Sequence, residues 1–574
     1  MKTVISFLFI ILLALHTMAN NSYTKQWQKV DSLQNLGQLQ SALDAVMTIY
    51  SQSKTDGHPD QTIRALLYKI RIEADFQENS YEKAIDFAQN ELVDAKTPVK
   101  QVLYSILAQL HWSYYQNNSW KINQRTPVAG NRSPDINTWD TRRFVEVSTN
   151  YYLLSVSEAD ALKNIPLGQF ESILEEKKST RNLRPTLFDF LVFRAIEFFS
   201  DERAAVTIPS NVFRMNDERY FSPIDEFVGI EILTEDTLSF EYQALKLYQQ
   251  VLQFHLTKTD VLPMVDADLA RLKYIHRKSI IPSKDELYID ALRSMLLNYR
   301  DQPVSAEISY ELASMLRTQG NKYNPLVSEA YKWQLKEALE IAESAVERFP
   351  DSDGANNCKV LINQIKSPAL NVTANNAVTP RLPSLALVGY RNIDSLYLRI
   401  VSLDYEADQK RLHQNQKDQI EKYFSIKAHT SWSLELPTDN DYQTHSTEIK
   451  LPQLPSGYYI LLASSTPDFN LESEVTFLPF WSTNISVIGK LTNNGFEFHI
   501  LGRKSGQPIP KLKIQLVRRN YDYRVGGIKD STVQHLVTDK NGFGIIPRGM
   551  TSENSQIYLK ISTPKDNFVT ETIW

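Results

Sequence analysis

Two short stretches of the sequence have residue types found in calcium-binding loops. One is Asp351-Ser-Asp-Gly354 and the other is Thr538-Asp-Lys-Asn-Gly542. Both lack the further carboxylates and the terminal glutamate that complete such a loop. We therefore expect the first to cap a helix and the second to form a hairpin turn.

Other patterns that carry chemistry are missing from the sequence. The ten histidines are scattered, and neither the His-Glu-x-x-His nor the Cys-x-x-Cys spacing of zinc sites occurs. There is no Gly-x-Ser-x-Gly elbow, phosphate-binding loop or dinucleotide fingerprint. We therefore predict no catalytic residue, no metal ligand and no cofactor site, and expect that the protein is not an enzyme.

Cys358 is the single cysteine. It shares a predicted helical face with Leu361, Ile362 and Ile365, so we expect a buried apolar side chain and not a reactive thiol. Asp189 and Arg194 lie in an apolar helix that spans 184–199. Because buried charges must be paired, we expect both to be structural partners and not catalytic groups.

A dense aromatic region lies between residues 112 and 152. Its members are Trp112, Tyr114, Tyr115, Trp120, Trp139, Tyr151 and Tyr152. Aromatic side chains dominate protein cores, so we favour packing over a ligand groove. If a helical surface of this protein binds a peptide, we expect it to be the concave side near these residues.

The elements that must position these residues change in kind near Ser367-Pro368. Over residues 20–366, apolar side chains recur every three to four positions, which is typical of helices. Around Ala338, Ala342 and Ala345, small residues share one helix face, and Pro350 follows. This resembles the second helix of a tetratricopeptide (TPR) repeat, so we predict an irregular TPR-like α-solenoid.

After residue 367 the sequence has short runs of β-branched and aromatic residues between turn residues. We predict one antiparallel β-sandwich over 367–480, with a charged helix or loop inserted near 404–425. The runs before and after Asn392 indicate either a hairpin or a corner between sheets. A second sandwich of immunoglobulin-like class is predicted over 481–574 from seven short strands. The fold class is thus multidomain, α followed by β.

Size, charge and the first residues set further limits. A chain of 574 residues is too long to fold around a single hydrophobic core. Its net charge of −5 gives no reason to expect nucleic acid as a partner. Residues 1–19 have a positive start, a short apolar segment and small residues at positions 17 and 19, which predicts a cleaved secretory signal. No later segment approaches transmembrane length, and we expect export to the periplasm or cell envelope of a Gram-negative bacterium.

Several of these segments resemble the N-terminal region of Bacteroidetes-type alpha-2-macroglobulin proteins. The helical part contributes Trp139-Asp140, the helix beginning Arg184-Pro-Thr-Leu-Phe-Asp-Phe-Leu191 and the repeat-like helices. A hairpin from Leu385 to Val401 and the run Gly457-Tyr-Tyr-Ile-Leu-Leu-Ala463 resemble a macroglobulin-like domain. The runs at Asn484-Ile-Ser-Val-Ile488, Gly506-Gln-Pro-Ile-Pro510 and Thr538–Gly544 resemble a further one.

The resemblance implies a family that traps proteases by means of a bait segment and, in many members, a Cys-Gln thioester. This sequence has no thioester motif, since Cys358 is its one cysteine, and it ends where the family continues. The resemblance therefore implies a non-catalytic, truncated N-terminal segment of an endopeptidase inhibitor. Its expected partners are proteases or envelope proteins, met through the remaining domains of a longer chain or subunit. The alternative is a self-standing exported protein that binds peptides or glycans of the cell envelope.

Overall fold

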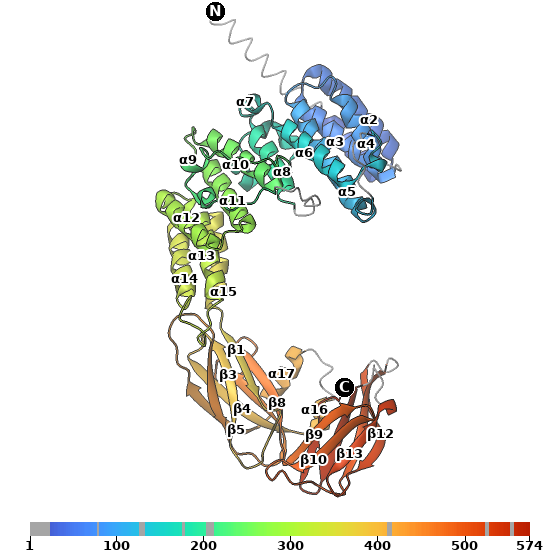
Figure 1. Ribbon diagram of the computed structural model, residues 1–574, viewed down its shortest axis with the longest axis vertical. Coiled ribbons are helices and arrows are strands. Elements are labelled where there is room, and N and C mark those ends of the chain that lie inside the picture. Colours follow the sequence, from blue (N-terminus) through green and yellow to red (C-terminus); the bar gives the residue numbers. More distant parts are fainter. Residues whose placement is uncertain are drawn as a thin grey trace, which may run out of the picture. The chain divides into compact units, whose positions relative to one another are not determined.

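The computed structural model describes residues 23–76, 80–125, 133–174, 178–201, 212–409, 416–522, 527–550 and 556–573. The predicted signal segment 1–19 lies outside these residues. The chain divides into two compact units, Met1–Val304 and Ser305–Trp574. Helices come first along the chain and strands follow (Figure 1). Among the residues described, no helix combines the length and the apolar character that crossing a membrane requires.

The described part of the first unit is helical, with neighbouring helices packed in pairs. A helix over 23–35 is followed by α2 (Leu39–Asp56), α3 (Pro59–Phe76), α4 (Ser80–Glu91), α5 (Val99–Ile122), η1 (Ile136–Thr138), α6 (Thr141–Ser155), α7 (Ala159–Leu162), η2 (Leu167–Ile173), η3 (Lys178–Leu183), α8 (Leu187–Phe199), η5 (Glu218–Phe221), α9 (Ile224–Phe227), α10 (Phe240–His255), α11 (Leu262–Lys278) and α12 (Lys284–Tyr299). Helix α2 packs against α3, α5 against α6, and α10 against both α8 and α11.

Helix α8 shows how the local sequence sets a helix boundary. The Thr186 side chain accepts a hydrogen bond from the Asp189 amide, and the Asp189 side chain accepts one from the Thr186 amide. This reciprocal cap satisfies two amide groups that the first helical turn leaves without partners. Most of the following side chains are buried, as the apolar composition predicts.

The second unit begins with three helices, α13 (Ser305–Gly320), α14 (Gln334–Arg348) and α15 (Asp353–Lys366). Ala338, Ala342 and Ala345 are buried on one face of α14, and the helix ends two residues before Pro350. Gly354 of α15 lies against the α13 backbone: a β-carbon built on it would be 2.3 Å from the Glu307 nitrogen. Small residues thus allow these helices to approach closely, as the spacing of the alanines in the sequence indicates.

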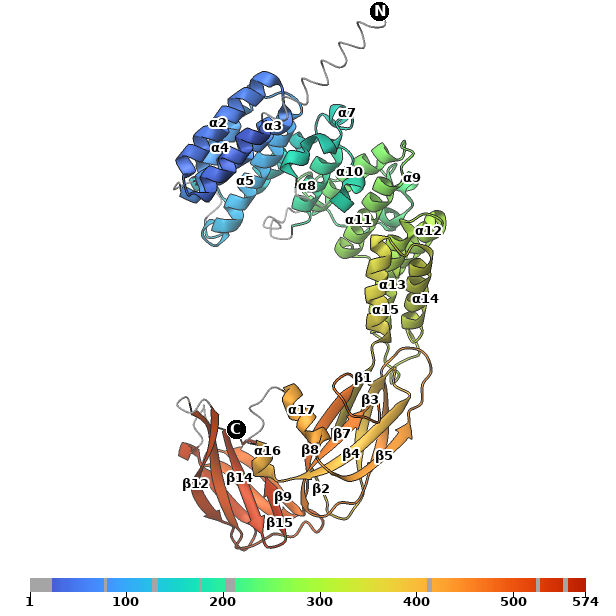
Figure 2. The same cartoon turned by 180° about the vertical axis from the view of Figure 1, so that it is seen from behind.

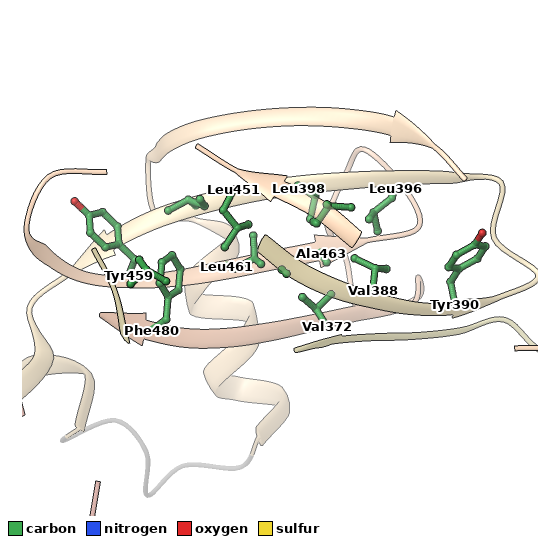
Figure 3. Close-up of a cluster of buried hydrophobic side chains, with 14 of the residues drawn as sticks. Val372, Val388, Tyr390, Leu396, Leu398, Leu451, Tyr459, Leu461, Ala463 and Phe480 are labelled. Atoms are coloured by element: carbon green, nitrogen blue, oxygen red, sulfur yellow. The ribbon is translucent and has the colours of Figure 1, made fainter. Parts of the chain in front are cut away.

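The first β domain has two sheets that enclose one apolar core. Its strands are β1 (Ala369–Ala374), β2 (Ala377–Val378), β3 (Ser384–Arg391), β4 (Ser395–Leu403), β5 (Ala428–Glu435), β6 (His445–Leu451), β7 (Gly457–Ser464) and β8 (Val475–Ser482). The sheet orders are β1-β3-β6 and β2-β8-β7-β4-β5, antiparallel except for β2 with β8. Side chains from both sheets, among them Val388, Leu398 and Leu461, meet in the core (Figure 3).

Two features of this domain correct the sequence prediction. Strands β3 and β4 belong to different sheets, so the connection is a corner, one of the two predicted alternatives. The hairpin from Leu385 to Val401 that the family resemblance implied is wrong. Asn392 makes this turn with a positive φ of 54°. Trp481, where the second β domain is predicted to begin, lies inside β8 and pairs with Tyr458 of β7.

The predicted insertion near 404–425 contains two short helices, α16 (Tyr405–Gln409) and α17 (Gln416–Phe424). They are not simply a charged surface feature, because Asp408, Ile420 and Tyr423 are buried. Ile420 and Tyr423 join an apolar cluster with β7 and β8 residues. The helices therefore cover part of the five-stranded sheet (Figure 2).

The second β domain contains all seven predicted strands: β9 (Ile485–Thr492), β10 (Gly495–Gly502), β11 (Lys513–Asp522), β12 (Gly527–Val537), β13 (Phe543–Pro547), β14 (Gln556–Thr563) and β15 (Asp566–Val569). They form sheets with orders β13-β10-β9 and β12-β11-β14-β15, all antiparallel. Phe498 and Ile546 from one sheet and Ile514 and Leu559 from the other share one buried cluster. The domain is thus an antiparallel sandwich.

Candidate functional site

Cys358 is a buried structural residue, as predicted. Its side chain is fully buried, and its Sγ lies 3.9 Å from the Ala306 carbonyl oxygen. Burial, with a smaller contribution from the Glu307 charge, raises the pKa of Cys358 to about 12. Because the thiolate is the reactive form, this thiol is inert near neutral pH.

The two calcium-like stretches form turns and caps. Ser352 caps α15 by accepting a hydrogen bond from the Ala355 amide at 3.1 Å, so the predicted cap is confirmed. Asp539 accepts hydrogen bonds from the Asn541 and Phe543 amides, both at 2.8 Å, which makes a tight turn. The turn is not a hairpin, because β12 and β13 lie in different sheets. Within the described residues, no group of three or more His, Cys, Asp or Glu side chains could hold a metal ion.

Asp189 and Arg194 have structural partners, as expected. His255 Nε2 lies 2.7 Å from Asp189 Oδ1, and both side chains are buried. The other Asp189 oxygen accepts hydrogen bonds from Thr186 in the helix cap. Arg194 Nε donates to Ser105 Oγ at 2.8 Å. The pairing with His255 was not predicted, since 66 residues separate the two side chains.

A second buried pair, Asp268 with Arg271, also escaped the sequence prediction. Arg271 Nε donates to Asp268 Oδ1 at 2.7 Å, and its other nitrogens donate to the carbonyl oxygens of Tyr220 and Ser222. Burial raises the pKa of Asp268, although the arginine opposes this shift. With its donors on the carbonyl oxygens of Tyr220 and Ser222, the pair holds the 220–222 segment in place.

The aromatic region is mostly core, which confirms the preference for packing. Trp112, Tyr114, Tyr115, Trp139 and Tyr152 are buried, whereas Trp120 is 72% exposed. His111 stacks on the Trp139 ring with centroids 5.4 Å apart. Burial lowers the pKa of His111 to about 4, so the ring is neutral at physiological pH.

A cavity in the second unit lies where the two β domains meet. Its volume is about 540 Å³. The lining residues come from α16, from β7 and β8, and from β9, β10, β15 and the residues that follow β15. Several of these elements carry labels at the junction in Figure 2. We call this cavity the inter-sandwich cleft.

One wall of the inter-sandwich cleft is a cluster of aromatic rings. Trp481 has ring contacts with Tyr405, Tyr458 and Phe568 at centroid distances of 5.2, 5.0 and 5.9 Å. Tyr458 donates a hydrogen bond to the buried Asp408 carboxylate at 3.0 Å, and Tyr423 donates to its other oxygen at 2.8 Å. The carboxylate thereby fixes helix α16 and its Tyr405 against β7.

Polar side chains also line the inter-sandwich cleft, among them Arg503 and Glu571. Arg503 donates to the carbonyl oxygens of Thr483 and Ile485 at 3.1 and 2.9 Å, and its burial lowers its pKa. Glu571 is exposed and accepts a hydrogen bond from Asn376. The described lining has aromatic and aliphatic surface with a few polar groups, which is typical of a binding site. It contains no cysteine or histidine and no nucleophile held by a base.

Of three comparisons with known proteins, only the one with solved structures finds matches. No family model matches the sequence, and no curated protein matches it significantly. Among solved structures, native alpha-2-macroglobulin from Escherichia coli, spanning domains MG0-NIE-MG1, matches with 11% identity and a TM-score of 0.27. The match covers 36% of this chain and 64% of that one. A fragment of the same protein spanning NIE-MG1 matches with 11% identity and a TM-score of 0.26, over 36% of this chain and 97% of that one.

Proposed function

We propose that this chain is a non-catalytic segment of an alpha-2-macroglobulin-like endopeptidase inhibitor, without a bait segment or thioester of its own. It serves as a scaffold and an interaction surface. The proposal begins from the sequence patterns around Arg184, Gly457 and Thr538 that resemble the Bacteroidetes-type family. The succession of a helical region and two β domains agrees with it.

The observation that carries the proposal is the joining of the two β domains through one apolar cluster. Val401 and Ile460 of the first domain share this cluster with Val517, Tyr558 and Val569 of the second. Arg519 of the second domain also donates to Gln409 of α16 at 3.1 Å. Side chains buried jointly by two domains resist independent motion of those domains, which suits a scaffold.

In this proposal the helical region is a TPR-like array. Its support is the close packing of α13, α14 and α15 through Ala338, Ala342 and Gly354. Such arrays present elongated surfaces to protein partners. The apolar segment within 1–19 supports export, and a single buried cysteine is compatible with a periplasmic or cell-envelope location.

A second candidate function is a self-standing exported protein that binds peptides or glycans. The inter-sandwich cleft favours it, because aromatic rings beside a few polar groups suit both kinds of ligand. Under this alternative, a ligand saturates the purified chain without any further domain.

The proposal is tested with the purified chain and a panel of endopeptidases. We expect no covalent adduct on denaturing gels, since the chain has no thioester, and no hydrolysis of peptide or glycoside substrates. Turnover of either substrate class, lost on replacement of one lining residue, would contradict the non-catalytic assignment. Saturable binding of a short peptide or oligosaccharide in the inter-sandwich cleft would favour the alternative.

A further inference from the structure

A groove of about 460 Å³ in the first unit lies between the end of α6, helix α7 and one face of α10. Its apolar lining is formed by Leu153, Val156, Ala159, Phe188 and Leu247. Its polar lining is formed by Ser157, Lys163, Gln243, Lys246, Gln250 and Gln253. We call it the α7–α10 groove. Labels of α7, α8 and α10 mark its place in Figures 1 and 2.

The charges of the α7–α10 groove have one sign. Lys163 and Lys246 line it, and none of the described lining residues is acidic. Lys163 Nζ lies over the rings of Phe188 and Phe254, at 5.1 and 5.5 Å from the centroids. Lys258 Nζ lies over the same Phe254 ring at 4.9 Å, which adds a third cation nearby.

Acidic residues around the groove do not neutralise these lysines. Asp160 contacts Lys163 at 3.5 Å, but its side chain is fully exposed, so solvent screens the pair. Glu158, on the turn before α7, accepts a hydrogen bond from Thr97 at 2.6 Å. Asp189, next to the lining residue Phe188 in the sequence, is buried and is held by His255. The groove therefore presents a positive surface within a chain whose net charge is −5.

The polar side chains of α10 follow a line along the helix. Gln243, Lys246, Gln250 and Gln253 recur every three or four residues, so they share one face over about 15 Å. That length matches about four or five residues of an extended chain. Carboxamides both donate and accept hydrogen bonds, as the backbone of an extended peptide requires, and ammonium groups pair with carboxylates.

We propose that the α7–α10 groove binds an extended acidic segment of a partner protein. The apolar lining takes alternate aliphatic side chains, Gln250 and Gln253 contact the peptide backbone, and Lys163 and Lys246 pair with carboxylates. The Gln243 amide stays on its own chain, where it donates to the Thr237 carbonyl oxygen at 2.6 Å. The charge complementarity selects this occupant over a basic or purely apolar segment. The inference does not depend on the resemblance to alpha-2-macroglobulin, and it concerns a different surface from the inter-sandwich cleft.

The test measures binding of a fluorescent octapeptide of alternating leucine and glutamate to the full chain by anisotropy. A matched peptide with glutamine in place of glutamate has the same shape without charge. We expect saturable binding of the acidic peptide, weakened as salt rises from about 50 to about 500 mM, and clearly weaker binding of the matched peptide.

Variants locate the binding in the groove. Lys163→Gln and Lys246→Gln should each weaken binding by about three- to fivefold, and the double variant by about tenfold or more. Lys246→Arg keeps the charge and should bind like the unmodified chain. Lys29→Gln removes an exposed lysine of the first helix, outside the groove lining, and is the matched control. Circular dichroism melting confirms that each variant is folded.

Three results would overturn the proposal. The acidic peptide does not bind saturably at millimolar concentration, the glutamine peptide binds as tightly as the glutamate peptide, or the double lysine variant binds as well as the unmodified chain. The last result would place the binding elsewhere on the surface.

Discussion

At the scale of single residues, His111 gives the first unit a dependence on pH. The folded chain buries its ring beside Trp139, and burial lowers its pKa from 6.5 to about 4. Between these values the unfolded chain takes up a proton that the folded chain excludes. The contribution to stability is therefore complete above pH 6.5 and is lost as the pH falls toward 4.

We predict that acidification from about pH 7 to about pH 4.5 lowers the free energy of unfolding of the first unit by up to about 3 kcal/mol through this residue. Urea unfolding at both pH values measures the loss, and His111→Phe should reduce it. The exposed His429→Gln control should keep the full loss. An equal loss in the His111→Phe chain would show that other groups cause the pH dependence.

Sequence reasoning at this scale identified buried residues but not their distant partners. The apolar surroundings of Cys358 and Asp189 in the sequence indicated burial, and both are buried. His255 and Arg271 gave no local signal, since one pairs across 66 residues and the other holds carbonyl groups about fifty residues away. Likewise, nothing near Asp408 indicated that its carboxylate binds Tyr458 of another strand.

At the scale of elements, local patterns predicted the strands better than their connections. The turn at Asn392 has the residue type required for a positive φ, but a hairpin and a corner share that requirement. The domain boundary predicted at residue 481 falls inside strand β8, whose apolar run is interrupted by Pro479. Strand β2 pairs with β8 at Trp481 and Ser482. Among the described residues, no strand pairs with Pro479 on the side away from β7, so its missing amide is tolerated.

The packing of α15 on α13 predicts a large effect of one methyl group. A β-carbon on residue 354 would lie 2.3 Å from the Glu307 nitrogen and 2.4 Å from the Ala306 carbonyl carbon, and backbone atoms cannot move aside cheaply. We expect Gly354→Ala to destabilise the second unit by about 1–3 kcal/mol in chemical denaturation. Gly549→Ala is the control in the same unit, because no atom lies within 4 Å of its built β-carbon. Equal stability of the two variants would contradict the close helix contact.

The junction between α13–α14 and the first β domain depends on the Gln443 side chain. Its amide nitrogen is buried and donates to the carbonyl oxygens of Gly320, Tyr331 and Lys332 at 3.2, 3.3 and 3.1 Å. Removing the donor leaves these carbonyls without a hydrogen bond from this side chain. A buried acceptor that loses its partner lowers the free energy of unfolding by about 1–3 kcal/mol.

We predict that Gln443→Ala speeds hydrogen exchange of the amides around 320–333 and 441–445, without changing exchange in the second β domain. Gln453→Ala replaces an exposed glutamine of the same domain and should leave exchange unchanged. Unchanged protection around 320–333 in the Gln443→Ala chain would mean that other contacts hold the junction.

At the scale of the whole molecule, the order of helices before strands could be predicted from the change in hydrophobic period at residue 367, and the structure places it between α15 and β1. The grouping of α13, α14 and α15 with the strands in one unit could not be predicted from the sequence. It depends on contacts between distant residues, such as those of Gln443 with Gly320 and Tyr331. The inter-sandwich cleft was also beyond prediction, since its lining comes from segments between residues 376 and 573.

The central claim is that this chain is a scaffold segment of a larger inhibitor, and the size of the native product tests it most directly. An antibody against the helical region is applied to fractionated cells that make the protein. The account predicts a band in the exported fraction far above 66.0 kDa, the mass of this chain. A single exported band near 66.0 kDa, less the signal segment, would contradict the claim and favour the self-standing binding protein.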